Sequence, residues 1–302
     1  MLAAEPTEAP EERWTIDALE KGSLVHDVLE AFFRELAKAA RPRDGEPYTA
    51  EDVELLERLA AARFEDARQR GVTGHELIWE VTRKQVLADL RTFLEEDTTW
   101  RRTQLLTPTY FEQPFGTKAA NAWPVVELPV GGGTLRFRGY IDRVDVSPDG
   151  RRAYVFDYKT GKPDKYRGLE TDPVLRGQHM QMAVYTRAVR AALDKDIEVG
   201  GAYWFVTSKG EFRQVALPAD PALVEGRLDA ALTAVSVGIQ QGVFPAVPGE
   251  ESRGGFSKCD HCPYDRVCTT TRDEEWERKQ HDGCAPFLAL ANGLAEIEEN
   301  GA

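Results

Sequence analysis

Residues 139–161 read GYIDRVDVSPDGRRAYVFDYKTG, and this stretch decides the fold of the 302-residue chain. Two runs of β-forming residues, 135–146 and 152–159, flank Ser147-Pro148-Asp149-Gly150, which has the composition of a tight turn. The sequence therefore predicts a β-hairpin. Asp157 and Lys159 are two positions apart, so their side chains project from one face. The hairpin would also bring Asp142 beside Asp157.

This predicted hairpin gathers two carboxylates and an amine. Carboxylate oxygens suit Mg²⁺, which keeps several waters and takes further ligands from substrate phosphate. Lys159 would then supply a point charge at the phosphate. A metal held in this way lowers the pKa of a bound water and stabilises charge in an in-line displacement. The pattern predicts phosphodiester hydrolysis, and the alternative is a solvated hairpin whose charges happen to alternate.

Three further segments accompany the hairpin. Gly22-Ser-Leu-Val-His26 opens an amphipathic helix with apolar residues at helical spacing. Gln181 and Tyr185 are four residues apart in a helix predicted over about 177–193, and hence lie on one face. Glu112 lies in a predicted strand. The alternatives are a structural histidine, a core tyrosine beside a surface glutamine, and an ordinary strand glutamate.

Taken together, these residues resemble the PD-(D/E)XK nuclease superfamily, specifically its RecB-like branch. The resemblance implies an α/β fold with a restriction-endonuclease-like core, in which helices flank a mixed central sheet. It implies that four residues hold Mg²⁺ or Mn²⁺: His26, Glu112, Asp142 and Asp157. Lys159 would steady the nucleophilic water and the scissile phosphate, while Gln181 and Tyr185 would position the DNA strand.

All four cysteines of the chain follow residue 258, at positions Cys259, Cys262, Cys268 and Cys284. Clustered thiols without a secretory signal favour a metal site over disulfides, and thiolates select zinc or iron–sulfur clusters. The spacing of the first three resembles the [4Fe–4S] staple of AddB-type subunits and CRISPR-associated exonucleases, whose fourth cysteine lies far upstream. Either Cys284 supplies the fourth ligand, or the chain begins downstream of the segment that carries it. Zn²⁺ is the alternative metal.

The remaining pattern predicts helices, then strands, then a mixture. Helices are expected over 15–40, 50–70 and 75–98, with Thr49 and Thr73 near their caps. Strands are expected at 106–115, 123–129, 134–146 and 152–159, followed by the helix over 177–193, a hairpin of 201–207 and 211–217, and a helix over 221–241. We expect a helical arm over 1–100, a nuclease core over 101–245, and a cysteine segment with a tail over 246–302, together forming one composite nuclease domain.

A net charge of −13 argues at first against a nucleic-acid partner, because phosphate binding usually leaves a basic footprint. Residues 1–100 hold 23 acids against 13 bases, whereas residues 132–168 hold nine bases against five acids. Six of those bases form a candidate DNA-tracking patch or an ordinary charged loop: Arg151, Arg152, Lys159, Lys162, Lys165 and Arg167. The acidic body leads us to expect that a partner subunit or helicase domain delivers the strand.

No apolar run approaches the length of a membrane span and no signal-peptide pattern is present, so we expect a cytoplasmic protein. The sequence has no phosphate loop of the Gly-x4-Gly-Lys-Ser/Thr type, so ATP hydrolysis is not encoded. The family resemblance implies a metal-dependent DNA exonuclease domain that processes DNA ends in double-strand-break repair with a helicase partner. The alternatives are a free-standing CRISPR-associated-type exonuclease and a non-catalytic DNA-binding or scaffold subunit.

Overall fold

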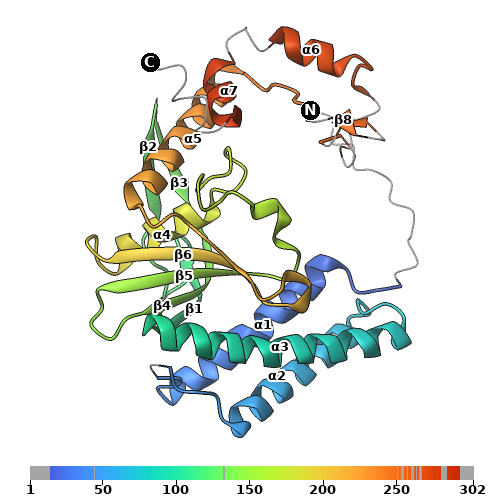
Figure 1. Ribbon diagram of the computed structural model, residues 1–302, viewed down its shortest axis with the longest axis vertical. Helices are drawn as coiled ribbons and strands as arrows, with labels where there is room; N and C mark the ends of the chain where they lie inside the picture. The colour runs from blue at the N-terminus through green and yellow to red at the C-terminus, as the bar shows by residue number, and fades with distance from the viewer. Residues whose placement is uncertain are drawn as a thin grey trace. The chain divides into compact units, whose positions relative to one another are not determined.

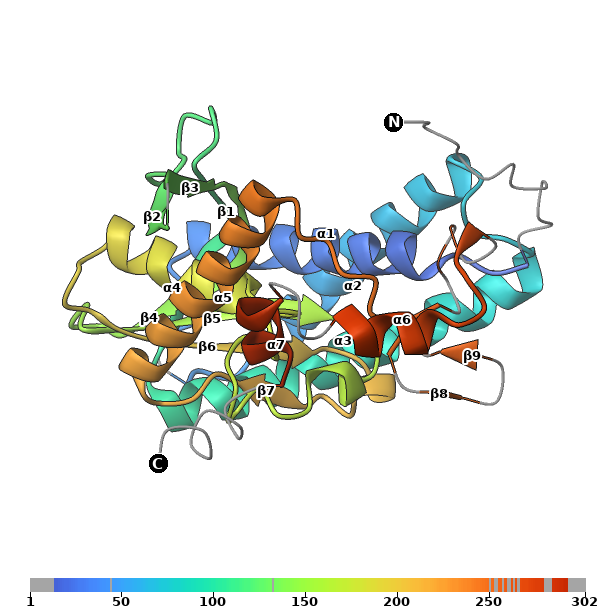
Figure 2. The ribbon, with the colours of Figure 1, turned by 90° about the horizontal axis from the view of Figure 1, so that it is seen from above.

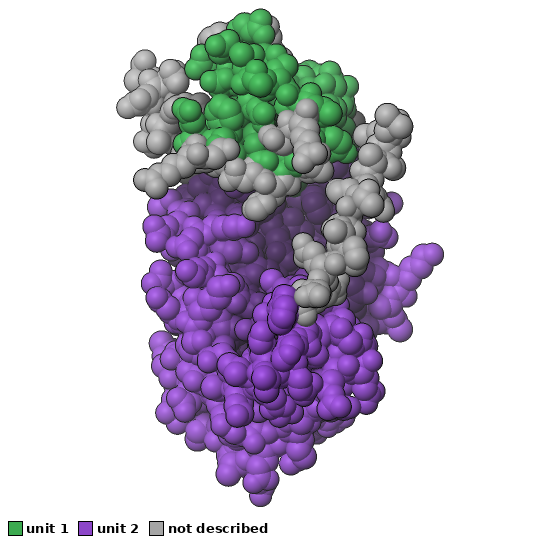
Figure 3. Space-filling model, turned by 90° about the vertical axis from the view of Figure 1, so that its right-hand side faces the viewer, with its two compact units in different colours: residues 1–11, 129–133, 229–302 green, residues 12–128, 134–228 purple. Residues whose placement is uncertain are grey.

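The structure is a computed structural model, and it describes residues 14–43, 45–131, 133–249, 251–252, 255–256, 258–259, 262, 264, 267–279 and 284–292. The chain divides into two compact units (Figure 3). The larger unit comprises Glu12–Leu128 and Thr134–Leu228, and the smaller comprises Met1–Glu11, Pro129–Gly133 and Asp229–Ala302. The three-part division expected from the sequence stays a prediction.

Three long helices open the larger unit: α1 (Ala18–Lys38), α2 (Ala50–Gln69) and α3 (Glu76–Gln104). As predicted, Thr49 caps α2. The Thr49 hydroxyl accepts from the Asp52 amide, and the Asp52 carboxylate accepts from the Thr49 amide, which makes a capping box. Thr73, which was expected near the cap of α3, lies two positions before the N-cap residue His75. His75 begins that helix without a side-chain cap, and its amide donates to the carbonyl of Trp14 at 3.1 Å.

A five-stranded mixed sheet forms the centre of this unit, in the order β1-β4-β5-β6-β7. The strands are β1 (Thr107–Phe115), β4 (Gly139–Val146), β5 (Arg152–Lys159), β6 (Glu198–Phe205) and β7 (Gln214–Ala216). Within this sheet β5 and β6 run parallel, and the other neighbours are antiparallel. A mixed sheet flanked by helices confirms the predicted fold class.

The strand expected over 134–146 is in fact two strands. Residues of β3 (Gly133–Phe137) pair with β2 (Val126–Val130) in a separate two-stranded sheet, whereas β4 pairs with β1 and β5. The chain therefore changes sheets at Arg138, and a continuous run of β-forming residues cannot reveal that change.

Helices α1 and α3 cover one face of the sheet, and α2 packs against these two helices (Figures 1 and 2). The core between them and the sheet includes Phe33 of α1, Phe93 of α3, and Phe156 and Trp204 of the strands. Removing this apolar surface from water is the main favourable contribution to the fold.

The other face of the sheet is covered by α4 (Gln181–Ala192). A β-carbon at Gly201 of β6 would lie 2.7 Å from the sulfur of Met182, so a larger residue there would force the Met182 side chain of α4 to shift. The helix predicted from residue 177 begins instead at Gln181. Gly177 adopts a left-handed conformation with φ of 81°, which a right-handed helix cannot include.

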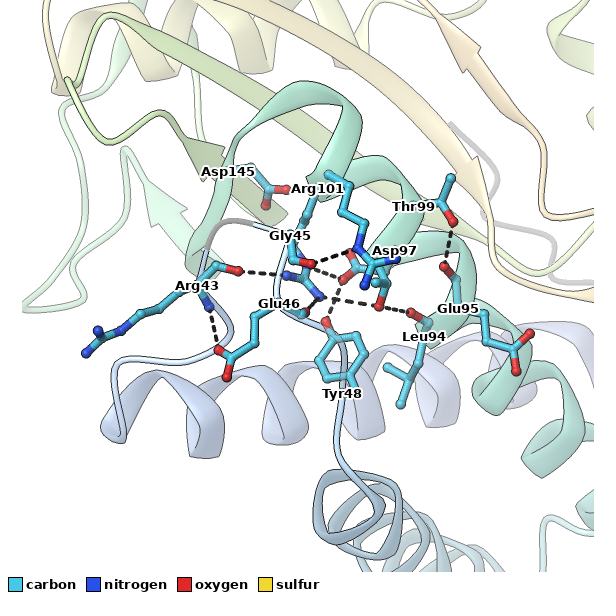
Figure 4. Close-up of polar contacts among 12 residues, drawn as sticks. Arg43, Gly45, Glu46, Tyr48, Leu94, Glu95, Asp97, Thr99, Arg101 and Asp145 are labelled. Carbon is cyan, nitrogen blue, oxygen red and sulfur yellow. Dashed lines mark hydrogen bonds and ion pairs between the residues drawn. The ribbon is translucent and has the colours of Figure 1, made fainter.

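A fully buried ionic network joins α3 to β4, and Figure 4 shows its part around Asp97 and Arg101. Asp97 accepts from Arg101 at 2.7 Å and contacts Arg143 at 2.5 Å, and Arg143 is also paired with Asp145. Tyr48 donates to Asp97 at 2.5 Å, while Arg101 also donates to backbone carbonyls of the segment between α1 and α2. Buried charges persist only when paired and hydrogen-bonded, as they are here.

The remaining elements are short except for α5 (Pro221–Gln241), whose bounds match the prediction. The expected hairpin near residue 210 is formed by β6 and β7, which flank a 3-10 turn over Ser208–Gly210. Another 3-10 turn spans Pro163–Tyr166. The smaller unit also contains β8 (Glu251–Ser252), β9 (Gly255–Phe256), α6 (Arg272–Lys279) and α7 (Ala285–Asn292).

Within the described part of the chain, no helix combines the length and apolar character that crossing a membrane requires.

Candidate active site

The predicted hairpin is present and sets the position of the acidic residues. Its turn is closed by the Ser147 amide, which donates to the carbonyl of Arg152 at 2.9 Å, and by Gly150 at φ 71°. In the antiparallel ladder Arg143 pairs with Phe156, so Asp142 and Asp157 occupy the next position outward. The hairpin therefore places these two carboxylates on neighbouring strands, as the sequence predicted.

Three potential metal ligands converge from three elements: His26 of α1, Glu112 of β1 and Asp142 of β4. Their ligand atoms all lie within 4.8 Å of one another. The Nδ1 atom of His26 is 3.4 Å from Asp142 Oδ2 and 3.8 Å from Glu112 Oε1. This group joins residues from distant parts of the sequence.

The backbone of Tyr158 orients two of these ligands. The His26 Nε2 atom lies 3.0 Å from the Tyr158 carbonyl, so Nε2 carries a proton and donates it to that oxygen. The Nδ1 atom is thereby directed at the carboxylates. The Tyr158 amide donates to Asp142 Oδ2 at 2.6 Å. One residue of β5 therefore fixes both the orientation of the histidine and the position of the aspartate.

Asp157 and Lys159 share a face of β5, as predicted, and form an ion pair. Asp157 is almost completely buried. Burial raises the pKa of Asp157, and the charge of Lys159 opposes that rise. Burial lowers the pKa of Lys159, but Asp157 outweighs it and raises this pKa, so Lys159 is an ammonium ion. The ring of Tyr203 lies beside that ammonium, with its centroid 5.4 Å from Nζ of Lys159.

Protons bind to the same ligand group that a metal would use. Burial and the charge of Asp157 raise the pKa of Asp142 to about 8. Burial lowers the pKa of His26, but the three surrounding carboxylates outweigh it and raise this pKa to about 9. The proton on Nδ1 stands where a metal ion would bond, so protons and a metal compete for this position.

Gln181 and Tyr185 lie one helical turn apart at the start of α4. The Gln181 side-chain amide donates to the Tyr185 hydroxyl at 2.8 Å. Burial raises the pKa of Tyr185, and among the further causes are the charges of Asp157 and Asp142. The predicted pair therefore lies within the electrostatic reach of the acidic group.

A cleft of about 760 Å³ opens over the ligand group. Its lining includes His26, Glu112 and Lys159, together with Arg34 of α1 and Tyr140 of β4. Tyr140 is 52% exposed, and it lies two positions before Asp142 on the same strand.

Four contributors to this site were not predicted from the sequence: Arg34, Tyr140, the backbone of Tyr158 and Tyr203. The alternation of side chains along a strand places Tyr140 on the same face as Asp142, so this tyrosine could have been found. The other three act through contacts between distant segments, and no local signal marks them.

The six bases that form either a candidate DNA-tracking patch or an ordinary charged loop do not all lie together. Arg152 begins β5 and Lys159 ends it, so about 23 Å of extended strand separates them. The Arg152 guanidinium donates to the carbonyl of Gln104, at the end of α3. The patch was suggested by closeness in the sequence, but strand β5 is extended and holds Arg152 and Lys159 apart at its two ends.

The four cysteines form no disulfide, and all four lie in the described part of the chain. Cys259 and Cys262 are partly buried, Cys268 is exposed, and Cys284 is buried directly before α7. Among the described residues, only one group of three or more histidine, cysteine or acidic side chains is close enough to share a metal ion. That group is His26, Glu112 and Asp142. The thiolates have the chemistry of a cluster or zinc site, but this structure does not gather them into one, and the iron–sulfur assignment stays a prediction.

Comparison with known proteins agrees with this geometry. A sequence profile of the PD-(D/E)XK nuclease superfamily matches residues 5–269. Three similar proteins are each named as a subunit of an ATP-dependent helicase/deoxyribonuclease. The one from Desulforudis audaxviator is 34% identical over 40% of this chain, the one from Symbiobacterium thermophilum 32% over 58%, and the one from Thermoanaerobacter sp. 25% over 64%. These alignments span 10%, 15% and 16% of the relatives' own lengths, respectively. Because the profile covers most of the sequence, the chain belongs to the PD-(D/E)XK nuclease superfamily.

Proposed function

We propose that this chain is a Mg²⁺- or Mn²⁺-dependent deoxyribonuclease domain that degrades DNA from an end. The observation that carries the proposal is the convergence of His26, Glu112 and Asp142 within 4.8 Å. Beside this group lies the ion pair of Asp157 and Lys159, at the margin of an open cleft.

The donor atoms fit the proposed metal. One imidazole nitrogen and several carboxylate oxygens are ligands that suit Mg²⁺ and Mn²⁺, whereas an iron–sulfur site requires thiolates. Asp157 lies across from Asp142 and would add a further oxygen. A bound ion would supply a water of lowered pKa and would stabilise negative charge on the reacting phosphate.

The residues around the proposed metal have separate roles in the reaction. Tyr158 holds His26 in the orientation that presents Nδ1, so no reorganisation of the ring is required. Lys159 has three donor hydrogens, and its pairing with Asp157 leaves donors for the scissile phosphate and for the attacking water. The Tyr185 hydroxyl accepts from Gln181 and so keeps its own hydrogen for a phosphate oxygen, which would position the strand.

The names of the similar proteins support a proposal for the biological setting. Because similar proteins are named helicase/deoxyribonuclease subunits, we propose that a helicase partner delivers the DNA strand and that the system processes ends in double-strand-break repair. The net charge of −13 supports delivery by a partner, because an acidic body repels DNA at long range. We further propose a cytoplasmic location, with Cys259, Cys262 and Cys268 holding a [4Fe–4S] cluster and Cys284 as a candidate fourth ligand.

One experiment tests the catalytic assignment. Linear and circular single-stranded DNA would be incubated with the wild type, Asp157→Ala and Asp149→Ala, in Mg²⁺, in Mn²⁺ and in EDTA. Asp149 is the matched control, because it lies in the turn of the same hairpin and is exposed. We expect the wild type and Asp149→Ala to degrade linear DNA only with metal, and Asp157→Ala to be inactive. Equal cleavage by all three proteins would refute the assignment, and cleavage of the circle would refute the requirement for an end.

The same preparation, purified anaerobically, tests the cysteine assignment. Absorbance in the iron–sulfur charge-transfer region with bound iron and sulfide would support the cluster. A colourless protein with stoichiometric zinc would assign the thiolates to zinc instead.

A further inference from the structure

Glu112 has a backbone conformation that is unusual for its residue type. Its φ is 42°, in the left-handed region, although it lies inside strand β1. The neighbours on both sides pair regularly with β4, Phe111 with Arg143 and Gln113 with Ile141. A β-carbon makes this conformation unfavourable, so surrounding contacts must hold it.

The unusual conformation coincides with the metal-ligand group. By the register of its neighbours, Glu112 lies across from Asp142. Its carboxylate is 3.8 Å from the Nδ1 atom of His26. The strained residue is therefore one of the three whose ligand atoms converge.

Arg34 supplies a contact that holds this backbone. Its Nη2 atom donates to the carbonyl of Phe111 at 2.6 Å, and that carbonyl belongs to the peptide bond that leads into Glu112. The guanidinium gives this carbonyl a hydrogen-bond partner, directly before the left-handed residue. The Nε atom of Arg34 donates to Glu30 at 2.8 Å, which fixes the guanidinium in place.

The helix that carries His26 also carries this contact. His26, Glu30 and Arg34 follow one another at four-residue intervals, so they share a face of α1, and all three line the cleft. Helix α1 thus contributes one ligand directly and contacts the backbone of a second.

We propose that Arg34 is a positioning residue for the metal site. By holding the Phe111 carbonyl, it keeps Glu112 in its left-handed conformation with the carboxylate directed at His26 and Asp142. This inference rests on the proposed function, because it takes Glu112 to be a metal ligand. A direct role for Arg34 in binding a DNA phosphate is the alternative, since its side chain lines the cleft and is 45% exposed.

Titration calorimetry with Mn²⁺ alone, without DNA, tests the proposal on the full chain. The variants are Arg34→Met, Arg34→Lys, Glu112→Gln and the double variant Arg34→Met with Glu112→Gln. Lys38→Met is the matched control, because Lys38 is on the same helix, is 69% exposed and pairs with Glu35 of that helix. Thermal unfolding in EDTA establishes that each variant folds.

We expect Arg34→Met to weaken Mn²⁺ binding roughly tenfold, the lower end of the effect typical of groups that orient a ligand. Lys38→Met should bind as the wild type does, and Arg34→Lys, which keeps a donor, should recover part of the affinity. In the Glu112→Gln background, Arg34→Met should have no further effect. Equal affinities of Arg34→Met and the wild type, or a full tenfold loss in both backgrounds, would overturn the proposal.

Kinetics separate this role from phosphate binding. For a positioning residue, Arg34→Met lowers kcat at limiting Mn²⁺, saturating Mn²⁺ restores it, and KM for DNA is unchanged. A raised KM for DNA with unchanged Mn²⁺ affinity would assign Arg34 a role in DNA binding. That result would overturn the positioning role but leave the proposed nuclease function standing. Failure of the wild type to bind Mn²⁺ would overturn the proposed function together with this inference.

Discussion

Asn in place of Asp142 should make the metal-free protein more resistant to high pH. Burial and the charge of Asp157 raise the pKa of Asp142 to about 8. Its Oδ2 atom accepts from the Tyr158 amide at 2.6 Å. Asparagine has the same shape and retains an oxygen for that amide, but it cannot ionise. Asp142→Asn therefore removes the titration while it keeps the hydrogen bond.

The sign and size of the effect follow from proton linkage. An unfolded aspartate has a pKa of about 3.9, so the folded protein binds this proton more tightly than the unfolded chain does. The stabilisation is fully present below about pH 4 and is lost as the pH rises through about 8. Each pH unit costs about 1.4 kcal/mol per proton, so the free energy of unfolding falls by about 3 kcal/mol between pH 6 and pH 9. For a unit of this size, that corresponds to roughly 6–12 °C in Tm.

Thermal unfolding in EDTA at pH 6, 7, 8 and 9 measures this difference. His26 adds to the slope in the same direction, because its pKa is raised to about 9 and its contribution is lost as the pH rises through that value. The wild type should lose stability with pH, and Asp142→Asn should lose clearly less. Asp164→Asn is the control, since Asp164 is largely exposed, with 62% of its side chain accessible. Parallel curves for the wild type and Asp142→Asn would refute the assignment of a buried proton to this group.

The strain at Glu112 predicts that Glu112→Gly is more stable than Glu112→Ala by about 1 kcal/mol in urea unfolding with EDTA, because only glycine adopts a φ of 42° without strain. Both variants should bind Mn²⁺ poorly, and an alanine variant as stable as the glycine variant would contradict the strain at this position. Asp97→Ala should lower the free energy of unfolding by about 3–5 kcal/mol, because it leaves Arg101 and Arg143 buried with fewer partners. Urea titration measures this free energy, and Glu95→Ala is the control because Glu95 is exposed on the same helix. Tyr140→Ala should weaken binding of single-stranded DNA by about 1–3 kcal/mol in fluorescence anisotropy, because an exposed ring in the cleft can stack on a base; an equal loss with an abasic strand would exclude stacking.

The hairpin was predictable because its information is local. The turn residues, the alternation in β5 and the pairing of Asp157 with Lys159 all lie in one short segment, and strand geometry alone relates them. His26, Gln181 and Tyr185 could be proposed only through the family resemblance. Their positions depend on packing between distant elements, which no local pattern encodes.

The contacts that hold the site were not predictable. Nothing near Arg34 in the sequence indicates that it donates to a carbonyl of β1, 77 residues later. The conformation of Glu112 is equally hidden, since glutamate has no preference for positive φ. The same limit applies to Arg143, whose charge suggests a surface residue although it is fully buried in the network with Asp97.

Metal affinity in this protein should depend on how firmly α1 is packed on the sheet. His26 reaches the ligand group only while its Nε2 atom contacts the Tyr158 carbonyl, and Arg34 reaches β1 from the same helix. The helix is held there by the stacking of Phe33 on Phe111, with ring centroids 5.5 Å apart. Loosening that interface would withdraw one ligand and release the backbone of another, although the aspartate of β4 would keep its bond to the Tyr158 amide. Because two of the three converging ligands depend on one helix, weakened packing of α1 should reduce metal binding before it unfolds the sheet.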